Sequence, residues 1–151
     1  MKEIIETWEI NNRINLYLLE SVKDEHLSSV AASKGRTVGE QFAHIHNVRL
    51  MWLKAAMPDL LNNVEKIENN AINKRFIAEQ LSKSSKVISQ LFEKSLAEGK
   101  LKGFKPHPAA FLGYIISHES HHRGQIVLSL KQSNHPVDKK ILFGLWEWGA
   151  R

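Results

Sequence analysis

The chain has 151 residues, of which 42% are hydrophobic and 25% charged, and this composition is typical of one globular domain spanning residues 1–151. It contains no cysteine, which excludes disulfides, thiolate metal sites and cysteine nucleophiles and agrees with a cytoplasmic location. The net charge is +5, but the lysines are scattered without interleaved aromatic residues and no run is apolar enough to cross a membrane, so we expect neither nucleic acid nor a membrane as partner.

Four segments have the apolar spacing of amphipathic helices, and none has the alternating pattern of a half-buried strand. The first covers about residues 2–22. The second begins at the tetrapeptide TVGE and ends near Pro58. Thr37 can accept a hydrogen bond from the backbone amide three residues on, while the side chain of Glu40 reaches back. The tetrapeptide therefore predicts a capping box at the start of the second helix.

The third and fourth helices also carry end signals. The third covers about residues 73–98 and is followed by Gly99, which predicts a C-terminal cap because glycine adopts the left-handed conformation at little cost. The fourth begins at Pro108, a residue favoured in the first turn of a helix, and ends near Gln132. The tripeptide NHP that follows is a helix breaker.

The last predicted element is an apolar tail, ILFGLWEW, at residues 141–148, which is too hydrophobic for a free end. We expect it to pack over one end of the helices or into a subunit interface. Four long amphipathic helices predict an all-α fold, an up-down four-helix bundle. Its longest connection, residues 59–72, joins helices two and three, and the C-terminal apolar tail follows helix four.

Histidines are concentrated in the second and fourth predicted helices. His118 and His122 are four residues apart, so their rings share one face of a helix, and that face is largely apolar. Two imidazoles at this spacing can reach one zinc ion at about 2.0–2.1 Å. A metal would satisfy one nitrogen of each ring, whereas the structural alternative is a pair of hydrogen-bonded core histidines. The pattern favours a metal site.

A third ligand is available from the second helix, where His44 and His46 both lie near the middle. Helical periodicity does not choose between them. Either one would give three neutral nitrogens and at least one open position, which is the pattern of a catalytic rather than a structural zinc site. His121 is turned about 100° away from His122 along the helix, so we expect it to line a pocket or to face solvent.

The same stretch, HESHH, also fits the zinc-peptidase signature H-E-x-x-H, in which Glu119 would be the general base. The extended signature is absent, because Gly124 comes one residue too early and no histidine follows at the required offset. No sheet edge is predicted that could hold a peptide. Glu119 also fits an ion pair with Arg123 or a contact that orients an imidazole. The peptidase is therefore the lesser alternative.

The second helix has a histidine followed by an aliphatic residue, within FAHIHNV, and the fourth helix has HESHHRGQI. In this combination the chain resembles the DinB-like superfamily of DNA-damage-inducible four-helix-bundle proteins. This superfamily includes YfiT-type metal-dependent hydrolases and thiol-dependent transferases and is distinct from the DNA polymerase of the same name. The resemblance covers nearly the whole chain and implies a site for zinc or nickel and, in many members, a homodimer. By motif position it implies the ligands His44, His118 and His122, with His46 as the weaker alternative. Gln125 shares the ligand face and could contact substrate.

The resemblance implies a metal site but does not assign a reaction. Three neutral imidazoles leave a divalent ion its full charge, which promotes loss of a proton from water or a thiol. We expect a metal-dependent enzyme acting on a small molecule, either a hydrolase or a transferase that uses a low-molecular-weight thiol. Glu119 and His121 are candidates for proton transfer, and Tyr114 for stabilising a developing negative charge. The alternative is a non-catalytic metal-binding or dimerisation module.

Overall fold

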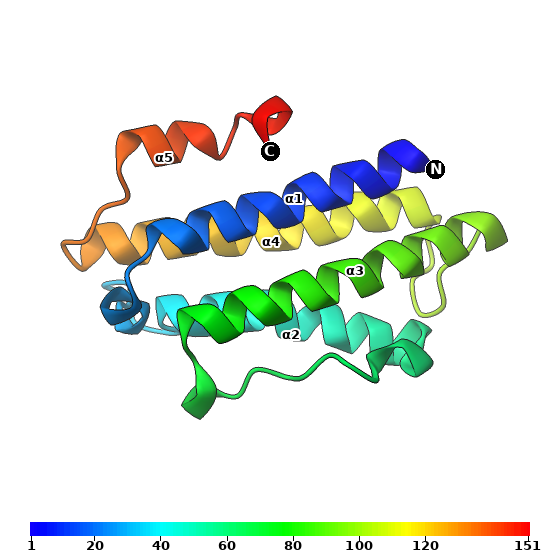
Figure 1. Cartoon of the computed structure of the whole chain (residues 1–151), viewed down its shortest axis with the longest axis horizontal. Helices are drawn as coiled ribbons and strands as arrows, with labels where there is room; N and C mark the ends of the chain where they lie inside the picture. The colour runs from blue at the N-terminus through cyan, green and yellow to red at the C-terminus, as the bar shows by residue number, and fades with distance from the viewer.

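The computed structural model describes all 151 residues and is helical throughout, without a β-strand beyond one isolated bridge (Figure 1). The helices are α1 (Lys2–Ser21), α2 (Val38–Ala56), α3 (Lys74–Glu98), α4 (Pro108–Gln132) and the short α5 (Lys139–Gly144). Short 3-10 helices lie between α1 and α2, between α2 and α3, and at the C-terminus. The all-α bundle predicted from the sequence is confirmed.

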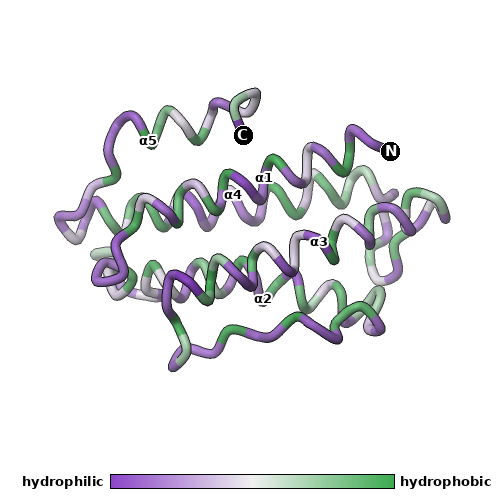
Figure 2. Tube along the Cα trace, viewed as in Figure 1, coloured by the Kyte–Doolittle hydropathy of each residue, from purple (hydrophilic) through white to green (hydrophobic).

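The long helices pack so that α1 and α2 each contact both α3 and α4. The connection between α2 and α3 travels back along the length of the bundle (Figure 1). Consequently α2 and α3 run in the same direction, and the chain departs from strict up-down alternation at this one crossover. Hydrophilic and hydrophobic stretches alternate along all four long helices (Figure 2), as their amphipathic pattern requires.

The helix ends form where local sequence signals place them. The amide of Glu40 donates to Thr37 Oγ1 at 3.2 Å, and the amide of Thr37 donates to Glu40 Oε2 at 2.8 Å, so the predicted capping box is confirmed. Gly99 ends α3 in the left-handed conformation, with φ of +70°. Pro108 lies in the first turn of α4, as predicted.

The core has two apolar clusters with a buried polar layer between them. One cluster surrounds Phe42, and the other surrounds Trp8 and Phe111. On each long helix, polar residues occupy the buried positions between the residues of these clusters. The members of this polar layer are Asn11, Asn12, Asn15, Arg49, Ser84, Glu119 and Arg123. It joins all four helices through hydrogen bonds and lies at the level of the fourth-helix histidines.

Three side chains hold the crossover connection against the bundle. Asn47 donates to the carbonyl of Ile67 at 2.9 Å and accepts from its amide at 3.0 Å. Gln80 accepts from the amide of Glu65 at 2.9 Å, and a ring nitrogen of His46 lies 2.7 Å from the carbonyl of Glu65. The connection is therefore a fixed wall of the bundle along α2.

The C-terminal tail doubles back along the side of the bundle instead of covering one end (Figure 1). The guanidinium of Arg151 lies 3.7 Å from the centre of the Tyr17 ring on α1, and Arg13 donates to the carbonyl of Arg151 at 3.3 Å. Phe143 and Trp146 point outward, with 71% and 82% of their surface exposed. None of the helices combines the length and the apolarity that crossing a membrane would require.

Candidate metal centre

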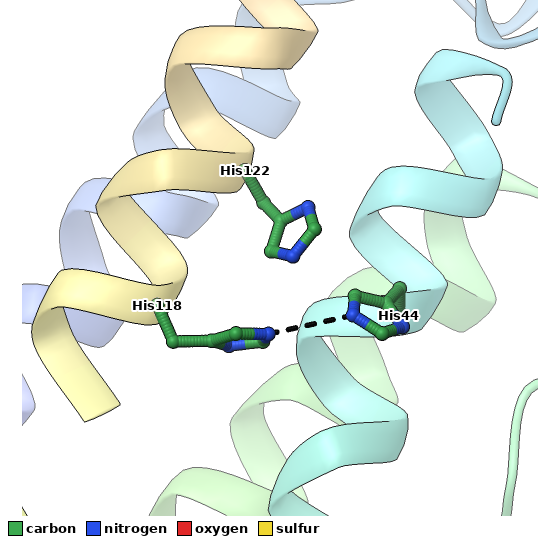
Figure 3. A group of neighbouring side chains, drawn as sticks. All are labelled: His44, His118 and His122. Carbon is green, nitrogen blue, oxygen red and sulfur yellow. Dashed lines mark hydrogen bonds between the residues drawn. The ribbon is translucent and has the colours of Figure 1, made fainter. Parts of the chain in front are cut away.

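Three imidazoles meet between α2 and α4: His44 comes from α2, and His118 and His122 come from α4 (Figure 3). One nitrogen from each ring lies within 4.8 Å of the others. The Nε2 atoms of His44 and His118 are 3.4 Å apart. Two nitrogens bound to one tetrahedral zinc ion at about 2.0–2.1 Å lie about 3.3–3.4 Å apart. The spacing of this pair therefore fits a shared divalent ion.

The rotation of α4 that points these rings toward α2 is set by the neighbouring residues. Glu119 and Arg123 directly follow His118 and His122, and both are buried in the polar layer on the neighbouring face of the helix. Because consecutive residues are about 100° apart on a helix, burying one member of each pair directs the other toward α2. The four-residue spacing then aligns the two rings along one face.

Gln41 orients the ring of His122. The Nδ1 atom of His122 lies 2.6 Å from Oε1 of Gln41, so Nδ1–H donates to this amide oxygen. The proton on Nδ1 leaves Nε2 of His122 unprotonated and free to bind a cation. Metal-binding histidines commonly use their second nitrogen in this way. Gln41 lies about one turn before His44 on α2, and sequence reasoning did not single it out.

The three rings are held in the neutral form. Burial, together with the neighbouring His118 and His44, lowers the pKa of His122 to about 4. Burial also lowers the pKa of His44 and of His118, and the positive charge of Arg36 contributes to the shift of all three rings. Neutral imidazole is the form that binds a metal, so all three rings can act as ligands near pH 7.

His118 lacks the hydrogen bonds of a satisfied core histidine. Its Nδ1 atom is buried and has no hydrogen-bond partner. Its Nε2 atom has only Nε2 of His44. A cation between the two Nε2 atoms would give each a stronger partner than another imidazole nitrogen, and three nitrogen donors fit a divalent transition metal.

His46 shows what a satisfied core histidine looks like in this chain. It is fully buried, with Nδ1 3.0 Å from Ser84 Oγ and Nε2 2.7 Å from the carbonyl of Glu65. Burial lowers its pKa to about 4. Both nitrogens are thus occupied away from the cluster. The sequence did not decide whether His44 or His46 is the third ligand. In the structure His44 is the one that meets the histidines of α4.

Glu119 is engaged in the polar layer. Its side chain is fully buried, Oε1 accepts from Arg49 Nε at 2.7 Å, and Oε2 accepts from the amides of Asn11 and Asn15, both at 2.7 Å. Burial by itself raises the pKa of Glu119, but Arg49 and the hydrogen bonds hold it below its ordinary value. The expected pair with Arg123 is replaced by the pair with Arg49. This placement does not support Glu119 as a peptidase base or a proton-transfer group.

The other predicted site residues lie outside the cluster, and of these only His121 has its ring next to a clustered histidine. The His121 ring centre is 5.1 Å from that of His122, and Gln125 donates to Nε2 of His121 at 2.8 Å. Tyr114 is 42% exposed and packs against the Trp52 ring, with centres 5.5 Å apart. None of these three belongs to the group of converging nitrogens. Their predicted roles as catalytic or pocket residues stay predictions.

The sequence was also compared with known proteins. The sequence model of the DinB family matches residues 1–138, a range that contains α1 to α4, Gln41 and all three clustered histidines. Searches of curated proteins and of solved structures found no match.

Proposed function

Because this chain belongs to the DinB family, we propose that it is a metal-dependent enzyme whose zinc or nickel ion is held by His44, His118 and His122. The observation that carries the proposal is the convergence of three neutral imidazoles from two helices. Membership of the DinB family and the 3.4 Å spacing between Nε2 of His44 and Nε2 of His118 support it. We propose that the substrates are small molecules, since the site lies between two helices of a small bundle.

Thiol transfer is the reaction that fits the surroundings of the cluster best. A divalent ion in this position supplies the charge that deprotonates a thiol, or water, near neutral pH. The carboxylates closest in sequence to the ligands are already used, Glu119 by Arg49 and Glu40 by the amide of Thr37. A thiol needs no separate carboxylate base, whereas activation of water commonly uses one. Hydrolysis is therefore the second candidate.

In the proposed reaction a low-molecular-weight thiol loses its proton, its sulfur bonds to an electrophilic carbon of a second substrate, and the leaving group departs from that carbon. The chain has no cysteine, so the sulfur must come from a cosubstrate. Gln41 keeps His122 in the tautomer that presents Nε2. His121 at the exposed edge is the candidate to take up the released proton, and Tyr114 the candidate to donate to developing charge.

A non-catalytic metal-binding or dimerisation module is the alternative from another functional class. The outward-facing Phe143 and Trp146 favour it, because large exposed aromatic side chains are enriched at protein interfaces. We propose a homodimer in either case. The alternative predicts bound metal without turnover.

The test begins with protein purified without added metal. Elemental analysis should find about one divalent ion per chain in the native protein and in His135→Ala, a surface histidine outside the cluster, and almost none in His118→Ala. The same samples are assayed with small thiols and a chromogenic aryl halide, and with activated esters. Thiol conjugation that needs His118 supports the proposal. Metal without either activity would support the binding module.

A further inference from the structure

A small cavity lies beside His44, with a volume of about 170 Å³. It is bounded by α2, by the loop before it and by the crossover connection, and the lining residues are Arg36, Glu40, Ala43, His44, Asn47 and Asn69. Since a water molecule occupies roughly 30 Å³, the cavity holds about the non-hydrogen atoms of a short organic acid. His44, a member of the histidine cluster, forms part of the cavity wall.

The protein itself uses two of the polar side chains in this cavity. Asn47 makes two hydrogen bonds to the backbone of Ile67, which fixes the connection that carries Asn69. Glu40 accepts from the amide of Thr37 in the capping box. These contacts set the shape of the cavity, and they leave little capacity in either side chain for a ligand.

Arg36 is the cationic side chain in the cavity, and unlike Asn47 and Glu40 it has no hydrogen-bond partner in the protein. Its guanidinium makes no ion pair and no hydrogen bond within the protein. Its cavity is shared with His44, a member of the histidine cluster. A guanidinium presents parallel N–H groups that match the two oxygens of a carboxylate.

We propose that Arg36 binds a carboxylate of the substrate, so that the site selects a small thiol that carries a carboxylate over a neutral one. This inference rests on the proposed function, because it assumes that the sulfur of the same molecule lies at the three histidines. The cavity beside His44 then holds the acid end of the thiol. A divalent ion and Arg36 together outweigh the single negative charge of Glu40, so the site attracts anions.

The test compares two thiols of equal length, 3-mercaptopropionate and 3-mercapto-1-propanol, as ligands of the cobalt-loaded protein. Cobalt reports sulfur binding directly through a near-ultraviolet charge-transfer band, without turnover. The variant is Arg36→Gln, and the control is Arg75→Gln, which removes the same charge from an exposed arginine that does not line the cavity. Both positions are exposed, so neither change is expected to affect folding.

We expect the native protein and Arg75→Gln to bind the acid about fivefold more tightly than the alcohol, and Arg36→Gln to bind both within twofold of each other. An equal affinity in the native protein, or a preference that survives in Arg36→Gln, would overturn the inference. Both results leave the proposed function intact if cobalt and thiol bind. A protein that takes up no cobalt would overturn the proposed function and this inference together.

Discussion

Glu119 and Arg49 form an ion pair inside the bundle, with Oε1 2.7 Å from Nε, Oε2 3.0 Å from Nη2 and neither side chain exposed to solvent. The pair joins α4 to α2, the two helices that contribute the clustered histidines. Glu119 directly follows His118 in the sequence, and Arg49 lies five residues after His44. The polar layer therefore fixes how the two helices that carry the candidate metal centre are rotated relative to each other.

The first prediction concerns the stability of this pair. Arg49→Met leaves the carboxylate of Glu119 buried without its cation, and breaking a buried pair in this way costs about 3–5 kcal/mol in the free energy of unfolding. Urea denaturation of the metal-free protein measures this loss in the free energy of unfolding. Glu79→Gln is the matched control, because it breaks the exposed pair with Lys83 and should leave the midpoint unchanged. Equal midpoints for the two variants would refute the prediction.

The ends of the helices could be predicted because their causes are local. The capping box of Thr37 and Glu40, the left-handed Gly99 and the first-turn Pro108 each depend on a few consecutive residues. The pairing of His118 with His122 is also local, since it follows from one turn of helix. These features are therefore present in the sequence whatever the tertiary arrangement.

The polar layer and the choice of third ligand depend on contacts between helices that are distant in sequence. Asn11 and Asn15 share the buried face of α1 with Trp8 and Leu18, but nothing local in the sequence indicates that their amides meet Glu119 of α4. His44 and His46 lie on a helix that is buried around much of its circumference, so periodicity alone cannot rank them. Only the packing of α2 against α4 and against the crossover connection distinguishes the two.

The second prediction concerns the contact between Gln41 and His122. Gln41→Leu removes the acceptor that holds Nδ1–H of His122, so we expect metal affinity to fall about 10- to 100-fold. Competition with a chromogenic chelator measures this change. Gln125→Leu is the control, because Gln125 binds His121 outside the cluster and should leave the affinity unchanged. If the affinity of Gln41→Leu equals that of the native protein, the contact has no role in binding.

The third prediction is a loss of stability in acid. The pKa of His46 is about 4 in the folded chain, below its ordinary 6.5, so between these values the unfolded chain binds a proton that the folded chain does not. Protonation then favours unfolding. The stabilisation that His46 provides above about pH 6.5 is lost as the pH falls toward 4, and it decreases by about 2 kcal/mol from pH 7.5 to pH 5.

Urea denaturation of the metal-free protein at the two pH values checks this third prediction. His122, whose pKa is also lowered to about 4, adds to the loss in the same direction. His46→Gln should reduce the difference between the two pH values, because one of the titrating groups is gone. Stability that is the same at pH 7.5 and pH 5 would contradict the assignment of His46 and His122 as buried neutral rings.

The fourth prediction separates the two histidines of α2 by two measurements. His44→Ala should abolish metal binding and change stability little, since His44 is partly exposed and its one polar contact is to His118. His46→Ala should keep about one ion per chain but lose about 2–3 kcal/mol in the free energy of unfolding, because it removes a fully buried ring and its contacts with Ser84 and the carbonyl of Glu65. Elemental analysis gives the first quantity and urea denaturation of metal-free protein the second, since bound metal would itself add stability. The opposite result, with metal lost in His46→Ala and kept in His44→Ala, would require α2 to be rotated from its observed orientation.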